Sequence, residues 1–82
     1  MNINWEDIET HKYTANWKRF RRCQAWTFYD GENIWIKSYN TIVAVIDSDG
    51  ALIIRQHYSR TTSKQITMIY NSYRNKTLAY KD

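Results

Sequence analysis

The sequence has no proline, only two glycines, one cysteine and no long apolar run. A single cysteine, Cys23, cannot form a disulfide framework, and this favours a reducing cytoplasm. Charged residues within the first twenty positions exclude the apolar core of a signal peptide. No apolar run approaches the roughly 18 residues that a membrane-spanning helix needs. With 82 residues, the chain is expected to form one domain with a small core, located in the cytoplasm.

Residues for catalysis and metal binding are also scarce. His11 and His57 are the only imidazoles, and no residue that could act as a general base adjoins Cys23 in the sequence. A small packed thiol is therefore the simpler interpretation. Two histidines and one cysteine do not supply a four-ligand zinc set. Residues 47–50 resemble the start of a calcium loop, but strand-like residues follow them. The sequence therefore predicts no enzyme, no metal site and no cofactor.

The two glycines, Gly31 and Gly50, both follow aspartate. Asp-Gly between alternating apolar runs is a strong signal for a β-hairpin. The first hairpin is predicted to join strands near 24–29 and 33–38, and the second to join 41–47 and 51–57. A short link at residues 38–40 would then connect the two hairpins into a four-stranded antiparallel meander.

Alternation assigns the faces of these predicted strands. Trp26 and Phe28 are expected on one face, and Ile34 and Ile36 are expected to point away from Trp35 and Lys37. The run at residues 42–46 is apolar at every position, which is typical of a central strand that is buried on both faces.

A helix is predicted over residues 62–75. Its apolar stripe repeats at i, i+3, i+4 and i+7, and consists of Ile66, Ile69, Tyr70 and Tyr73. Thr62 and Gln65 have the spacing of a capping box, with Thr61 as the alternative cap. Met68 falls on the outer face of this helix, where it is either a lone exposed apolar residue or a contact residue.

The N-terminal part carries a weaker helical pattern. Tyr13, Trp17 and Phe20 have helical spacing, so a helix over about 15–23 is favoured over a strand, and a helical turn is predicted at Trp5 to Glu9. The predicted fold class is α+β: a four-stranded antiparallel meander, a helix over about 62–75 on one face, and a helical N-terminal segment.

The net charge of +4 is unevenly distributed along the chain. Residues 1–10 carry three acids and no base, and residues 11–24 carry five bases and no acid. Residues 25–58 carry four acids and two bases, and residues 59–82 carry five bases and one acid. Two basic segments therefore flank a mildly acidic middle. Such segments favour phosphate backbones or acidic protein surfaces, although a basic surface also serves solubility alone.

Two stretches are candidates for binding an anion. At residues 17–22, cations alternate with aromatics, as in nucleic-acid-binding segments, unless the aromatics are buried in the core. At residues 59–64, hydroxyls and cations precede a helix start, where free backbone N–H groups attract anions, unless these hydroxyls only cap the helix. The predicted partner-binding residues are Lys18, Arg19, Arg21, Arg22, Ser59, Arg60, Thr61 and Lys64.

Aromatic residues make up 16% of the chain, and this fraction exceeds what one covering helix is expected to bury. Some of Tyr29, Trp35 and Tyr39 are therefore expected to be exposed and to anchor a partner.

Two motifs resemble a family of small phage and plasmid proteins. Residues 38–44 read S-Y-N-T-I-V-A and residues 58–66 read Y-S-R-T-T-S-K-Q-I, against S-Y-x-T-x-V-A and Y-S-x-T-T-S-x-H-I in that family. Gln65 stands where the family has histidine. The resemblance covers about residues 34–70 and implies a mobile-element origin and a strand–helix core, with no established activity.

Small phage proteins of this kind commonly block a host complex, so the resemblance implies an anti-CRISPR-type inhibitor of a host defence nucleoprotein. A basic chain is a poor DNA mimic, and it would instead contact nucleic acid or an acidic face of the effector. The alternative is a stand-alone nucleic-acid-binding accessory or regulatory protein. The edge strands of the predicted sheet would also allow two copies to pair as a homodimer.

Overall fold

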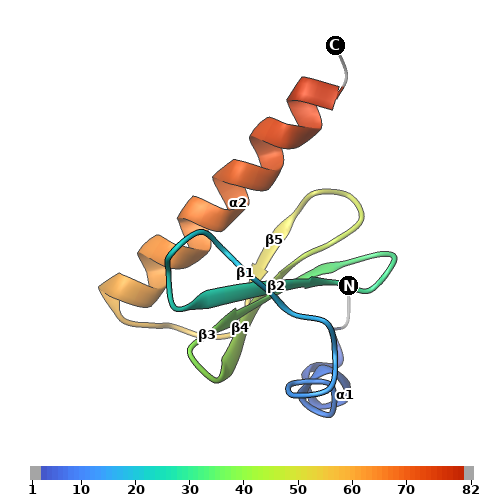
Figure 1. Cartoon of the computed structure of the whole chain (residues 1–82), viewed down its shortest axis with the longest axis vertical. Helices are drawn as coiled ribbons and strands as arrows, with labels where there is room; N and C mark the ends of the chain where they lie inside the picture. The colour runs from blue at the N-terminus through green and yellow to red at the C-terminus, as the bar shows by residue number, and fades with distance from the viewer. Residues whose placement is uncertain (1–2, 81–82) are drawn as a thin grey trace.

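The computed structural model describes the backbone of residues 3–80 and the side chains of residues 3–73, and it is an α+β fold (Figure 1). Five antiparallel strands lie in the order β1-β2-β3-β4-β5, a simple meander. The elements are α1 (Trp5–Glu9), β1 (Lys18–Arg19), β2 (Ala25–Tyr29), β3 (Ile34–Ser38), β4 (Thr41–Ile46), β5 (Leu52–Ile54) and α2 (Arg60–Tyr80). Within the described chain, no helix is both long and apolar enough to span a membrane.

The long helix α2 covers one face of the sheet. Ile66 and Ile69 are 1% and 0% exposed and pack on strand residues that include Ile36 and Ala44. Tyr73 of the same stripe shares a 3.0 Å hydrogen bond with Thr27 of β2. The helical stripe and the faces assigned by alternation are therefore confirmed.

The short helix α1 and the segment after it cover the opposite face. Ile8 packs there with Trp35, Ile42 and Val45. The Trp5 ring meets Trp35 edge to face, with centroids 5.8 Å apart. The predicted helical turn at Trp5 to Glu9 is confirmed, and the sheet is buried on both sides.

Strand β4 is an interior strand that is buried on both faces, as its apolar run predicts, and it contains a bulge. Ile36 pairs with Ala44 while Lys37 pairs with Ile42, so Val43 is an extra residue in β4. Such an insertion places two successive side chains on one face. Val43 and Ala44 consequently both pack toward α2.

The predicted helix over 15–23 is wrong. Lys18 and Arg19 form β1, which pairs with β2 and raises the strand count from the predicted four to five. Trp17 packs on the α1 face of the sheet and Phe20 on the α2 face. The helical spacing of these aromatics therefore reflects two separate cores on either side of one sheet.

The predicted bounds of α2 and β5 also need correction. Helix α2 spans Arg60–Tyr80 rather than 62–75, and neither Thr61 nor Thr62 is its cap. The cap is Ser59, whose Oγ accepts a 3.4 Å bond from the backbone N–H of Thr62. Strand β5 is Leu52–Ile54 rather than 51–57, and the side chain of Arg55, just beyond it, bonds to Glu9 and to the carbonyl of Ile42.

Candidate anion-binding surface

The loops and turns that connect the strands lie at two opposite ends of the sheet. Because Ala25 pairs with Ser38 and Ser38 with Thr41, the β1–β2 loop and the β3–β4 turn share one end. Strand β5 runs back toward that end, so residues 55–59 and the start of α2 also lie there (Figure 1). The β2–β3 and β4–β5 turns lie at the opposite end.

That opposite end is acidic. Its turns, residues 30–33 and 47–51, contain four carboxylates and no cation. Partial burial acts to raise the pKa of Asp30. Hydrogen bonds from the Trp35 indole and from the backbone N–H groups of Asn33 and Glu32 outweigh it and hold that pKa below its usual value. Asp30 thus stays a carboxylate that shapes its own turn.

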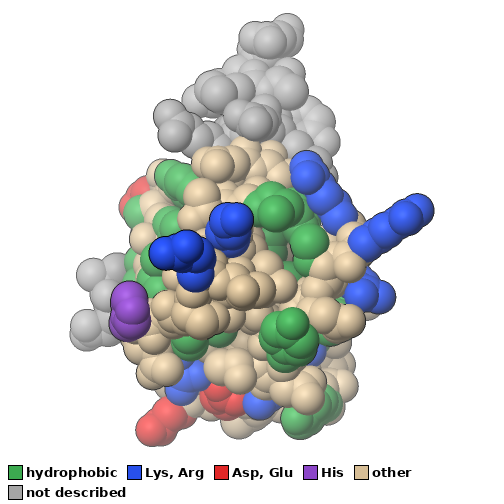
Figure 2. All heavy atoms as spheres, turned by 90° about the vertical axis from the view of Figure 1, so that its left-hand side faces the viewer, with side chains coloured by type: hydrophobic (Ala, Val, Ile, Leu, Met, Phe, Trp, Pro, Cys, Tyr) green, Lys and Arg blue, Asp and Glu red, His purple; other side chains and the backbone are tan. Residues whose placement is uncertain are grey.

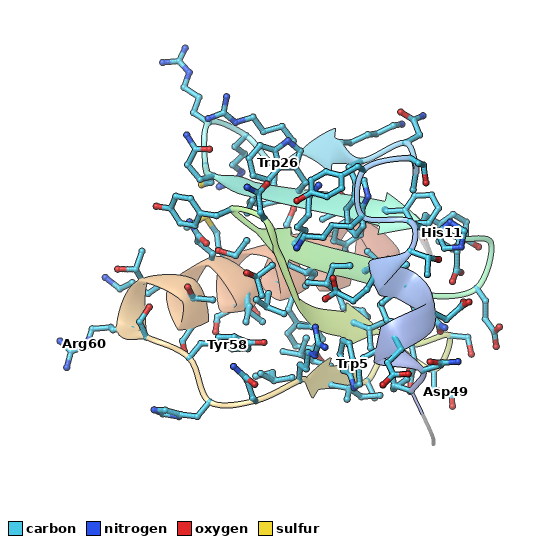
Figure 3. All side chains as sticks on the ribbon, turned by 90° about the horizontal axis from the view of Figure 1, so that it is seen from below. Trp5, His11, Trp26, Asp49, Tyr58 and Arg60 are labelled. Carbon is cyan, nitrogen blue, oxygen red and sulfur yellow. The ribbon has the colours of Figure 1, made fainter. Side chains whose placement is uncertain are left out.

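The other end of the sheet carries exposed cations, and we call it the basic end. Its cations are Arg19, Arg21, Arg22, Arg60 and Lys64. Among residues 3–73, none of these five lies within 4.0 Å of a carboxylate. Figure 2 looks onto this end and shows Lys and Arg side chains on both sides of exposed hydrophobic ones. Arg60 and Asp49 lie on opposite sides of the molecule in Figure 3. Cations from both predicted basic segments are therefore brought together at one end.

The cations at the end of β1 and in the β1–β2 loop differ in the contacts that their side chains make. The guanidinium of Arg19 donates to the carbonyl of Cys23 at 2.8 Å and lies over the Trp26 ring, so it braces the loop. Arg21 lies over the Phe20 ring. Arg22 is exposed, and within the described chain its side chain has no bonding partner. Arg22 is thus the cation of this loop most available to another molecule.

The cations of α2 line a shallow hollow on its outer face. Arg60, Lys64 and Met68 contribute to it, and Met68 is 39% exposed. Thr61 is exposed, whereas Ser59 is used as the cap. Lys18 is exposed on the edge strand, one residue farther from the basic end than Arg19.

Two groups that could have contributed to the predicted anion-binding surface are not available to a partner. Arg55 lies at this end of β5, but its ion pair with Glu9, 2.7 Å long, neutralises it. The rings of the 17–22 segment are also occupied: Trp17 packs against Phe28, and Phe20 packs on the α2 core. This segment therefore offers charge to a partner and not free rings.

The residue that the sequence analysis missed is Lys37, which is only 8% exposed. Its Nζ donates to the carbonyl of Lys12 at 3.1 Å and lies 4.7 Å from the Trp17 ring centroid and 5.5 Å from that of Trp26. The available signal was a lone cation on the inward-facing side of a strand that is otherwise apolar.

The motif segments around residues 38 and 65 meet in the fold. The hydroxyl of Ser38 donates to Oε1 of Gln65 at 2.6 Å, so the end of β3 is joined to the second turn of α2. Gln65 therefore has a structural partner at the position where the resembled motif has histidine.

The sequence matches a model of a protein family. The family model described as "Family of unknown function (DUF8033)" matches residues 8–82. No curated protein and no solved structure matches the sequence.

Proposed function

Because the chain belongs to the DUF8033 family, whose description names no activity, we propose its function from the basic end. The protein is a non-catalytic binding protein that places this end on the phosphates of a host nucleoprotein and inhibits that complex, as an anti-CRISPR-type inhibitor does. The observation that carries the proposal is the grouping of five exposed cations without a carboxylate partner among the described residues.

The energetics favour an anionic partner of high charge density. Exposed cations are individually well solvated, and a single surface ion pair contributes only about 0–1 kcal/mol. A phosphate backbone differs because each contact also releases condensed counterions. Several cations at one end would therefore act together on a nucleic acid and would lose affinity steeply as salt rises.

The resemblance to phage and plasmid proteins supports an inhibitor in particular. The two resembled segments meet at the bond between Ser38 and Gln65, adjacent to the basic end. The carboxylates at the opposite end are few and belong to tight turns, which gives little support to mimicry of DNA by an acidic surface.

The alternative function is a stand-alone nucleic-acid-binding accessory or regulatory protein. It is favoured by the same cations, since they need no second protein to contact phosphate. The two functions differ in what binds under physiological salt: free nucleic acid for the alternative, and an intact protein–nucleic acid complex for the inhibitor.

The test compares two single changes that lower the net charge by the same amount at opposite ends of the sheet. Arg22→Gln and Ser48→Glu each lower the net charge by one, and both positions are exposed. Tagged wild-type protein is expected to retain a nucleoprotein complex from a bacterial lysate, and Arg22→Gln to retain severalfold less. Retention is measured by mass spectrometry of the protein and by sequencing of the bound nucleic acid.

Ser48→Glu is the control and is expected to behave as the wild type. Retention of free nucleic acid alone would favour the accessory protein. Equal retention by all three proteins, or none by any of them at low salt, would contradict the proposal.

A further inference from the structure

Tyr39 has an unusual backbone conformation at the centre of the basic end. Ser38 pairs with Thr41, so Tyr39 and Asn40 form the two-residue β3–β4 turn. Tyr39 has φ of 54°, in the left-handed region that glycine and asparagine tolerate and bulky residues avoid. Its backbone N–H donates to the carbonyl of Gln24 at 2.8 Å, which ties this turn to the loop carrying Arg21 and Arg22.

Contacts of the Tyr39 side chain do not explain this backbone conformation. Tyr39 is 57% exposed, and among the described residues its ring has no aromatic or cationic partner. Backbone conformations of this strained kind cluster at functional sites. The backbone bond to Gln24 supports this conformation, and no ring or cation contact of the Tyr39 side chain among the described residues adds to that support.

The other strongly exposed tyrosines are placed differently. Tyr29 lies at the acidic end, and its hydroxyl donates to the carbonyl of Gly31. The Tyr13 ring contacts the Lys12 ammonium at 5.6 Å. Trp26, on the sheet face, lies between the cations of Arg19 and Lys37. Among the described aromatics, Tyr39 is thus the exposed and unengaged ring located between the two groups of cations.

We propose that the Tyr39 ring stacks on an unpaired base of a single-stranded nucleic acid whose phosphates contact the basic end. This inference rests on the proposed function and specifies its partner. A base in a duplex is already stacked on its neighbours, whereas a single strand presents free π-faces to a ring flanked by cations. Recognition is expected to tolerate any base sequence, because every base has such a face.

The test measures, at low salt, the fluorescence anisotropy of a labelled oligodeoxynucleotide of about ten nucleotides, within the usual site size of a small binding module. Wild-type protein is expected to bind this strand more tightly than a duplex with the same number of phosphates. Tyr39→Asn is expected to weaken single-strand binding roughly fivefold to a hundredfold. Tyr39→Phe keeps the ring and is expected to bind as the wild type.

Thermal unfolding separates this effect from damage to the fold. Asparagine suits a positive φ, so Tyr39→Asn is expected to unfold at the same temperature as the wild type or at a higher one. A variant that is at least as stable and yet binds less tightly would support a binding role for the ring.

Three results would overturn the inference: unchanged single-strand binding by Tyr39→Asn, equal binding of duplex and single strand by the wild type, or no binding of either at low salt. None of these decides the proposed function, which the lysate comparison of Arg22→Gln and Ser48→Glu tests separately.

Discussion

Lys37 shows how one side chain ties together three parts of the chain. It lies on β3, bonds to the carbonyl of Lys12, and lies over two indole rings from different segments. Cation–π contacts of this kind contribute about 0.5–2 kcal/mol, more as the cation is desolvated. Lys37 therefore fastens the segment before β1 to the sheet without any carboxylate.

Burial lowers the pKa of Lys37 below its usual value, and the positive charge of Lys12 lowers it further. Between the folded-state pKa and 10.5, the unfolded chain binds more protons than the folded one, so stability rises with pH across that window. Below the folded-state pKa, Lys37 is charged in both the folded and the unfolded chain. The full free-energy cost of burying this charge then lowers the stability of the folded protein.

Replacing Lys37 with methionine removes this titration while keeping a long apolar side chain. The wild type is expected to gain stability relative to Lys37→Met as the pH rises from neutral toward 10.5. Urea unfolding of both proteins at several pH values measures the difference, and shared groups such as the tyrosines cancel in it. A difference that does not change with pH would show that Lys37 titrates as it does in the unfolded chain.

At the scale of elements, α2 contributes to one core through a narrow stripe, whose buried residues are Ile66 and Ile69. Ile69 is completely buried, whereas its neighbour Met68 is 39% exposed on the outer face. The sequence period predicts this stripe, but it does not predict the first residue of the helix. The cap was misassigned because several hydroxyls in a row satisfy the same local rule, and Ser59 alone is aligned with the free N–H of Thr62.

Truncating the stripe should destabilise the protein strongly. Ile69→Ala is expected to lower the free energy of unfolding by about 2–5 kcal/mol, because it removes buried methyl groups and leaves a cavity. Met68→Ala, one residue away, is expected to change it by no more than about 0.5 kcal/mol. Chemical denaturation measures both, and similar losses for the two variants would contradict the observed orientation of α2.

The segment before β2 shows why local pattern fails for edge elements. Strand β1 has only two residues, too few for alternation to be read from the sequence. Its conformation depends on pairing with the free edge of β2, and the chain then places Trp17 and Phe20 on opposite faces. The pairing of β1 with β2 thus determines the conformation of this segment, although three of its aromatics have helical spacing.

At the scale of the whole molecule, the connections at the two ends of the sheet differ in charge, as far as the structure describes their side chains. At one end, the β1–β2 loop carries arginines and the start of α2 carries Arg60 and Lys64, whereas the turns at the other end carry carboxylates and no cation. A molecule of this kind is oriented by the field of an anionic partner before contact, which raises the rate of productive encounter. Binding should then depend on where the charge lies and not only on its total.

A charge transplant tests this. The double variant Arg22→Gln with Ser48→Lys keeps the net charge at +4 and moves one positive charge from the basic end to the acidic end. It is expected to bind single-stranded DNA as weakly as Arg22→Gln alone and to lose about one unit of salt slope. Affinity equal to the wild type would mean that net charge alone controls binding. The measurement is a salt titration of the dissociation constant.

The sequence by itself determined the hairpins, the central strand, the buried stripe of α2 and the presence of two basic segments. These features depend on local rules: Asp-Gly turns, alternation, helical period and residue charge. The tertiary structure decided the fifth strand, the cap at Ser59, the burial of Lys37 and the neutralisation of Arg55. It also gathered loops distant in sequence at one end of the sheet and left the Tyr39 ring exposed among them. These outcomes depend on strand pairing and desolvation between distant segments, which no local pattern encodes.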